Sequence, residues 1–300
     1  MRGIVTVLNT PFGLSNDIDH EALRRHVDYA LAAGVAGFLV PAMAAEVEAL
    51  SDAERDAILT TVTQTVAGKV PVIGGASAPT PEERLADARR IGQLGCDIVL
   101  ASLSTHDAND LADEIGRLAD ASGLPVMVQD WDATSVGLPV SAIVGAFQRE
   151  EAFRYLKVET ANAGAKYSQL KTETSGALHV SGGWAVQQLI EALDRGVDAF
   201  MPTAMHFAYV RIIDLYRSGD RAAAVDLFRR LLPVLAFSNQ NLELSIRFFK
   251  RLLWRQTLYP TPDIRVGRID PDEFQMRIMD ELIELAMTLE TELGWRPVNT

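Results

Sequence analysis

The chain has 300 residues, of which 48% are hydrophobic and 23% are charged, a composition typical of a globular protein. The net charge of −12 argues against nucleic acid as a partner, and the single cysteine, Cys96, excludes an intramolecular disulfide and a cysteine cluster for zinc. The sequence starts in a strand-like run without the features of a secretory signal, and no apolar run approaches the roughly 18 residues of a membrane span, so we expect a cytoplasmic protein without a membrane partner.

Strand-like and helical segments alternate along the first two thirds of the chain. Runs rich in β-branched and aliphatic residues predict strands at 3–9, 35–41, 71–75, 97–102, 125–129, 153–160, 177–181 and 197–202. Apolar residues at helical spacing predict helices at 19–33, 51–66, 80–94, 108–121, 140–149, 163–174, 184–194 and 205–217. Two of these helices open with a capping box, in which Ser51 or Thr80 precedes a glutamate by three residues.

This alternation predicts parallel pairing of the strands. Eight units in succession favour a closed barrel over an open sheet, which gives an α/β fold of the (β/α)8 TIM-barrel type. Beyond residue 218 the pattern changes to helices only, predicted at 221–234, 239–257 and 271–294. We therefore expect a barrel over residues 1–218 and a C-terminal three-helix region over residues 219–300, a helical appendage that supplies a packing or oligomer surface.

The sixth predicted strand carries a lysine between apolar neighbours. Because side chains alternate along a strand, Lys157 and Glu159 share one face, and Leu156 and Val158 share the other. A buried lysine is costly to keep charged, and an amine that has lost its proton is a nucleophile. From this stretch alone, a satisfied core lysine or a lysine at an exposed strand end is an equally good interpretation.

In a (β/α)8 barrel, chemistry takes place at the C-terminal ends of the strands. The residues expected there are Thr10, the segment 42–46, Ser77, Ser102, Gln129, Asp130, Lys157, Glu159, the segment 181–183 and Thr203. Lys157 is the only amine among them. A carboxylate beside it can form a buried ion pair or can serve acid–base chemistry. No group of histidine, cysteine and carboxylate residues has the spacing of a metal site, so no metal is expected.

Short motifs follow one another in an informative order: Thr-Pro-Phe at 10–12 with Asp-Ile-Asp at 17–19, Glu46 before Leu-Ser at 50–51, Pro-Val-Ile-Gly-Gly at 71–75, the lysine strand, and Ser-Gly at 181–182. This order resembles the dihydrodipicolinate synthase and N-acetylneuraminate lyase superfamily over nearly the whole chain. The resemblance implies a (β/α)8 barrel, typically a homotetramer. It also implies that Lys157 forms a Schiff base with pyruvate or another 2-keto acid and that no separate cofactor is needed.

Two departures from the family pattern narrow the expected activity. Where the family carries a Gly-Thr-Thr-Gly-Glu signature, this chain has Ala-Met-Ala-Ala-Glu at 42–46, so backbone N–H groups near Ala44 and Ala45, or other side chains, would hold the substrate carboxylate. Where the family has a proton-relaying tyrosine, this chain has Gln129, and an amide does not relay protons. The synthase and sialic acid lyase activities are therefore disfavoured.

The pair Gln-Asp on the fifth strand with Lys-Val-Glu-Thr on the sixth resembles the sugar-acid branch of the superfamily, which includes L-2-keto-3-deoxyarabonate dehydratase. This resemblance implies a lyase that dehydrates a 2-keto-3-deoxy sugar acid, with Glu159 as general acid and base. The expected catalytic residues are Lys157, Glu159 and Gln129, and the expected substrate-binding residues are Thr10, Ala44, Ala45, Asp130, Ser181, Gly182 and Gly183. The segment 181–183 can equally be a tight turn. A pyruvate-dependent aldolase and a non-catalytic keto-acid-binding barrel remain as alternatives.

Overall fold

The computed structural model describes residues 1–76, 78–267 and 270–296. Ser77, one of the residues expected at the C-terminal ends of the strands, therefore lies outside the described residues. The chain divides into two compact units. The first consists of Met1–Val5, Ala36–Val40 and Gly68–Met201, and the second of Thr6–Val35, Pro41–Ala67 and Pro202–Thr300. The predicted division at residue 218 rests on the change to a purely helical sequence, which is a different criterion, and it stays a prediction.

Eight parallel strands pair in sequence order into a closed barrel, which confirms the predicted fold. They are β1 (Gly3–Val7), β2 (Gly37–Val40), β3 (Val72–Gly75), β4 (Ile98–Ser102), β5 (Val126–Asp132), β6 (Phe153–Thr160), β7 (His179–Gly182) and β8 (Ala199–Phe200). The first unit holds all of them apart from the last two residues of β1. Their aliphatic residues are buried, as expected for strands that are covered on both faces.

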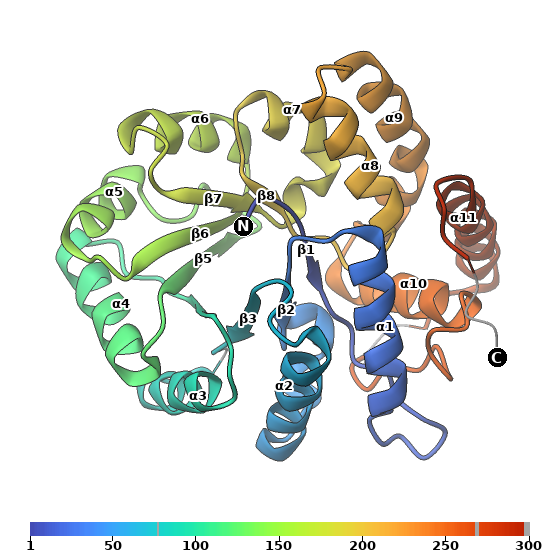
Figure 1. Ribbon diagram of the computed structural model, residues 1–300, viewed down its shortest axis with the longest axis horizontal. Coiled ribbons are helices and arrows are strands. Elements are labelled where there is room, and N and C mark those ends of the chain that lie inside the picture. Colours follow the sequence, from blue (N-terminus) through green and yellow to red (C-terminus); the bar gives the residue numbers. More distant parts are fainter. Residues whose placement is uncertain (77, 268–269, 297–300) are drawn as a thin grey trace. The chain divides into compact units, whose positions relative to one another are not determined.

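Helices connect the strands within the first unit, where they follow one another around the outside of the barrel (Figure 1). They are α3 (Pro81–Gln93), α4 (Ala108–Ser122), α5 (Val140–Arg149), α6 (Ala163–Glu173), the 3-10 helix η3 (Trp184–Gln188) and α7 (Leu189–Asp194). Where the sequence predicts one α-helix over 184–194, the structure has η3 followed by α7. The capping box that opens α3 is confirmed, because the Thr80 side chain accepts from the backbone N–H of Glu83.

The second unit is mostly helical. Its helices are α1 (His20–Ala33), η1 (Met43–Ala45), η2 (Val47–Ala49), α2 (Asp52–Val66), α8 (His206–Arg217), α9 (Arg221–Ser238), α10 (Leu242–Arg255) and α11 (Glu273–Glu292). The three predicted C-terminal helices are therefore present, and the capping box at Ser51 is confirmed. Among the residues that the structure describes, no helix is both long and apolar enough to cross a membrane.

The β5–β6 ladder is longer than the sequence predicts. The fifth strand was expected to end at Gln129, but it continues to Asp132 because each added residue pairs with β6, up to the partnership of Asp132 with Thr160. By contrast, β8 contains only two residues where the sequence predicts six. The long ladder extends the barrel wall past the register pair Gln129–Lys157, and it is this part of the first unit that carries the candidate site.

Candidate active site

Lys157 and Glu159 form a buried ion pair on one face of β6. The Lys157 ammonium nitrogen Nζ lies 2.8 Å from Glu159 Oε2, and the two side chains are 6% and 9% exposed. The contact confirms that the two residues share a face, as the alternation along the strand predicts. Removing two charges from water is costly unless they neutralise each other, so each residue offsets part of the cost of burying the other.

Gln129 joins this pair from the neighbouring strand. It is the register partner of Lys157, and its amide Nε2 donates a hydrogen bond of 2.6 Å to Glu159 Oε2. One carboxylate oxygen is therefore held by both the ammonium group and the amide. An amide can orient a carboxylate but cannot carry a proton for it. In this group of three side chains, Glu159 is the one placed to accept a proton from Lys157.

On the other side of β6, the neighbouring strand β7 and the residue after it lie beside Lys157. Ser181 is the register partner of Lys157, and its hydroxyl donates to the Leu156 carbonyl at 3.1 Å. Gly183 follows the strand, and a Cβ at this position would lie 2.8 Å from Lys157 Cε and would overlap with the Glu159 carboxylate. Glycine is therefore the residue that fits beside the ion pair. Ser181 and Gly183 lie against the pair, whereas their expected contact with a substrate stays a prediction.

Asp130 faces the opposite side of β5 from Gln129. Its Oδ2 forms an ion pair with Lys166 of α6, and its Oδ1 accepts from the backbone N–H of Leu138 at 2.8 Å. Both carboxylate oxygens thus have partners outside the Lys157 group. Lys166 is buried and on a helix, where sequence alone gave no reason to single it out.

Thr10, Ala44 and Ala45, the other expected substrate contacts, lie in the second unit. The Thr10 hydroxyl donates to the Ala45 carbonyl at 2.7 Å, and the Asn9 amide donates to the Ala44 carbonyl at 2.6 Å. The N–H of Ala45 donates to the Ala42 carbonyl at 2.8 Å, so it is used within the turn itself. The structure brings these residues together with one another, and their role in holding a carboxylate stays a prediction.

A second buried lysine–glutamate pair was missed by the sequence analysis. Lys250 of α10 is fully buried, and its Nζ lies 2.7 Å from Glu46 Oε1 and 4.0 Å from the ring centre of Phe12. Burial lowers the pKa of Lys250 from 10.5 to about 8, and the nearby Glu46 carboxylate opposes that shift. The signal was available, because Lys250 falls at helical spacing between the buried Ile246 and Leu253.

The second unit also contains a fully buried polar cluster. The hydroxyl of Tyr29 donates to Glu290, and a ring nitrogen of His26 lies 2.9 Å from the Tyr259 hydroxyl. Burial raises the pKa of Glu290 to about 7 and lowers the pKa of His26 to about 3. His206 packs against His26 with a ring separation of 5.8 Å. Within residues 1–76, 78–267 and 270–296, no group of three or more His, Cys, Asp or Glu side chains could hold a metal ion.

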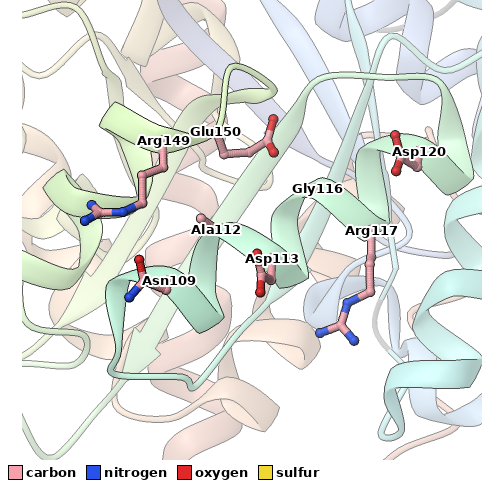
Figure 2. A pocket seen from close by; sticks show the side chains of 8 residues that line it. All are labelled: Asn109, Ala112, Asp113, Gly116, Arg117, Asp120, Arg149 and Glu150. Carbon is pink, nitrogen blue, oxygen red and sulfur yellow. The ribbon is translucent and has the colours of Figure 1, made fainter.

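A cavity of about 460 Å³ lies on the outside of the first unit. Figure 2 shows that its lining comes from α4 and from the end of α5, with Gly116 facing the Glu150 side chain. Two arginines and three acidic residues line it, together with Asn109 and Ala112. These residues lie on the outer helices and not at the strand ends. The cavity is therefore separate from the Lys157 group.

The fold and the site together define a (β/α)8-barrel protein with a buried amine and a buried carboxylate near the end of its sixth strand. A sequence model of the dihydrodipicolinate synthetase family matches residues 1–251, and the chain belongs to that family. Members of the family are lyases that act on small molecules, and they are typically oligomeric. The chain is therefore a lyase of this family.

The chain is similar to several known members of the family and to solved structures. The L-2-keto-3-deoxyarabonate dehydratase of Azospirillum brasilense is 29% identical over 250 residues, which cover 80% of each chain. Dihydrodipicolinate synthase from Rhodopseudomonas palustris shares the fold with a TM-score of 0.84 at 21% identity, over 95% of this chain and 97% of that one. A prophage protein of the same family from E. coli K12, solved in complex with pyruvate, has a TM-score of 0.82 at 18% identity, over 97% and 99% of the two chains.

Proposed function

We propose that the protein dehydrates a 2-keto-3-deoxy sugar acid through a Schiff base on Lys157. The observation that carries this proposal is the buried Lys157–Glu159 pair, whose carboxylate is oriented by Gln129. The activity named for the A. brasilense relative supports the class of substrate, and the pyruvate complex of the E. coli relative supports a 2-keto acid. The imine itself supplies the chemistry, so the proposal includes no separate cofactor.

The first step is attack of the Lys157 amine on the C2 ketone of the substrate. The ammonium group must lose a proton before its lone pair can attack, and Glu159 lies 2.8 Å away to take that proton. Glu159 returns that proton to the hydroxyl of the resulting carbinolamine, which leaves as water, and this gives an iminium ion and restores the carboxylate. The iminium makes the C3 protons acidic, because the enamine that forms on deprotonation spreads the carbanion's charge onto nitrogen.

The second step is elimination at C3 and C4. Glu159, or a water held by it, takes the C3 proton, and the same carboxyl group then protonates the C4 hydroxyl as it leaves as water. Hydrolysis of the remaining imine releases the dehydrated keto acid and regenerates Lys157. Gln129 keeps Glu159 in place during these transfers, since its amide cannot exchange the proton itself.

Two other functions, one catalytic and one limited to binding, are the alternatives that the experiment must distinguish. A pyruvate-dependent aldolase would use the same lysine, but its base would act on the C4 hydroxyl and the C3–C4 bond would break. A keto-acid-binding barrel would bind the ligand without turnover. The proposal also includes a homotetramer and a cytoplasmic location, which are the assembly and compartment expected from the sequence.

The test is intact mass after sodium borohydride treatment in the presence of pyruvate or of individual 2-keto-3-deoxy sugar acids. The parent protein and a Lys69→Ala control, which changes an exposed lysine, should both give a reduced adduct, and Lys157→Ala should give none. The adduct mass distinguishes loss of water from C3–C4 cleavage. An unmodified parent with every keto acid would contradict the lysine mechanism, and an adduct without turnover would favour the binding barrel.

A further inference from the structure

The end of β5 is bonded to α6 by a buried lysine, Lys166, whose ammonium group has an acceptor for each of its three protons. Lys166 Nζ forms an ion pair with Asp130 Oδ2 and donates hydrogen bonds to the carbonyls of Val136 at 2.6 Å and Leu138 at 2.7 Å. An ammonium group has three protons, and these three acceptors account for all of them. The Lys166 side chain is only 7% exposed, so these contacts compensate for the loss of its hydration.

The segment 133–138, which follows β5, is folded around this lysine. The Leu138 N–H donates to Asp130 Oδ1 at 2.8 Å, so the far end of the segment is bonded to the strand from which the segment leaves. Gly137 has a φ of +67°, and a Cβ there would overlap with the Asp130 carboxylate and with the Thr160 methyl group. A left-handed backbone in so little space needs glycine, which indicates a segment held in one conformation.

The same segment reaches the end of β6. The N–H of Ala161 donates to the Ser135 carbonyl at 2.9 Å, two residues beyond Glu159. On β5, Asp130 directly follows Gln129, and successive side chains of a strand point to opposite faces. Anchoring Asp130 to α6 therefore fixes the stretch of backbone from which the Gln129 side chain leaves the strand. The strand ends that carry Gln129 and Glu159 are joined by their own ladder and by the Ala161–Ser135 hydrogen bond, and the Lys166–Asp130 ion pair attaches the end of β5 to α6.

We infer that Lys166 and Asp130 are positioning residues for the reaction, because their ion pair holds the end of β5 and the segment 133–138, which is hydrogen-bonded to the end of β6, so that Gln129 meets Glu159. This inference rests on the proposed function, since it assigns the group that aligns its proton carrier. It also gives Asp130 a role that differs from the expected direct contact with substrate.

A matched control lies on the same helix. Lys171 of α6 forms an ion pair with Asp198 Oδ2, and Asp198 also accepts from the N–H of Val180 at 2.9 Å. Asp198 directly precedes β8, so this pair lies at the N-terminal ends of the strands, whereas Asp130 lies near the C-terminal end of β5. Both lysines lie on one helix and pair with an aspartate, although Asp198 also has Arg2 as a partner at 3.3 Å, and of the two pairs only that of Lys166 is joined to Gln129 and Glu159.

The experiment compares Lys166→Met with Lys171→Met for thermal unfolding, borohydride adduct formation with pyruvate, and steady-state kinetics on the sugar acid that the parent turns over. Both variants should unfold at a lower temperature than the parent, and both should form the adduct because Lys157 is intact. For Lys166→Met we expect kcat to fall about ten- to a hundredfold with KM within about threefold, since a small displacement of a catalytic group costs rate. Lys171→Met should keep kcat within about twofold of the parent.

The outcomes separate the two proposals. If the parent forms the adduct and turns over the sugar acid, and folded Lys166→Met has the same kcat as the parent, the positioning role alone is overturned. An equal loss of kcat in both variants also overturns it, because a general loss of structure would then explain the result. A parent without any adduct overturns the proposed function, and the inference falls with it.

The double variant Asp130→Asn/Lys166→Met guards against failure of the single variant to fold. It leaves no uncompensated buried charge, and replacing both partners of a buried pair costs much less stability than removing one. It still lacks the lysine contacts with Val136 and Leu138, so its kcat should remain about tenfold or more below that of the parent. Parental kcat in the folded double variant would contradict the inference.

Discussion

The two units each contain a buried lysine–glutamate pair, and the two pairs differ in what surrounds the carboxylate. In the first unit, Lys157 lies 2.8 Å from Glu159, and the second partner of Glu159 is the side chain of Gln129. In the second unit, Lys250 lies 2.7 Å from Glu46, whose other oxygen accepts from the backbone N–H groups of Arg265 at 2.6 Å and Val266 at 2.8 Å.

The difference separates a carboxylate that is oriented by a neighbouring side chain from one that is fixed by the backbone. Backbone donors cannot turn away from Glu46 without moving the chain, so its carboxylate is held in one orientation. Side-chain partners can rearrange while the strands stay in place. Ion pairing and burial alone therefore do not identify a catalytic lysine. The kind of group that holds the partner carboxylate is the more informative property.

The largest effect is expected when the proton carrier is removed from the first pair. Glu159→Gln keeps the size of the side chain but cannot transfer a proton, so kcat should fall about 10²- to 10⁴-fold. Lys157 is still present, so borohydride should still trap an adduct, although more slowly. Steady-state kinetics and intact mass on the same sample give both readings. Parental kcat would show that another group carries the proton.

The same substitution in the second pair should lower stability and leave the chemistry of Lys157 intact. Glu46→Gln leaves the fully buried Lys250 without its counter-charge, and breaking one side of a buried pair costs about 3–5 kcal/mol of stability. Denaturant unfolding should show this loss. Per folded molecule, adduct formation by Lys157 should be retained. If Glu46→Gln kept parental stability, the distinction between the two pairs would be wrong.

A smaller effect on activity is expected from filling the space beside the first pair. In Gly183→Ala, the added methyl group would lie 2.8 Å from Lys157 Cε and would overlap with the Glu159 carboxylate. The two side chains must separate to admit it, so we expect both adduct formation and kcat to fall about a hundredfold. Gly13→Ala is the control, because its Cβ would meet only the Asp17 carbonyl at an ordinary 3.7 Å. Unchanged kinetics in Gly183→Ala would show that the pair is not closely packed.

The architecture could be predicted from sequence because its signals are local. Each strand and helix carries its own periodicity, and eight alternating units leave few arrangements other than a barrel. Lys157 and Glu159 could be placed on one face for the same reason, since they are two residues apart on one strand. The end of β5 could not be placed, because it depends on pairing with β6 up to Thr160.

The helical spacing of Lys250 indicates that it faces the interior, but its partner and the partners of Asp130 could not be predicted from the sequence. Lys250 and Lys166 are on helices, where lysine is usually exposed, and their burial depends on partners far away in the chain. Glu46 lies 204 residues before Lys250. Asp130 was expected to face a substrate, and only the position of α6 shows that its carboxylate has Lys166 as a partner.

The smallest predicted effect tests the charge of the second pair through pH. The pKa of Lys250 is about 8 in the folded protein and 10.5 as the ordinary value. Between these values the unfolded chain binds more protons than the folded one, so this group alone makes the protein more stable as pH rises. From pH 7.5 to 9 the gain amounts to about 1 kcal/mol.

This gain can be isolated by measuring unfolding free energies of the parent and of the double variant Glu46→Gln/Lys250→Met across that range. The double variant lacks the titrating pair but keeps every other ionisable group, so subtracting its curve removes their contributions. The difference should move by about 1 kcal/mol in favour of the parent as pH rises. A flat difference would mean that Lys250 stays protonated as firmly in the folded protein as in water, and that the Glu46 carboxylate and the Phe12 ring compensate for its burial completely.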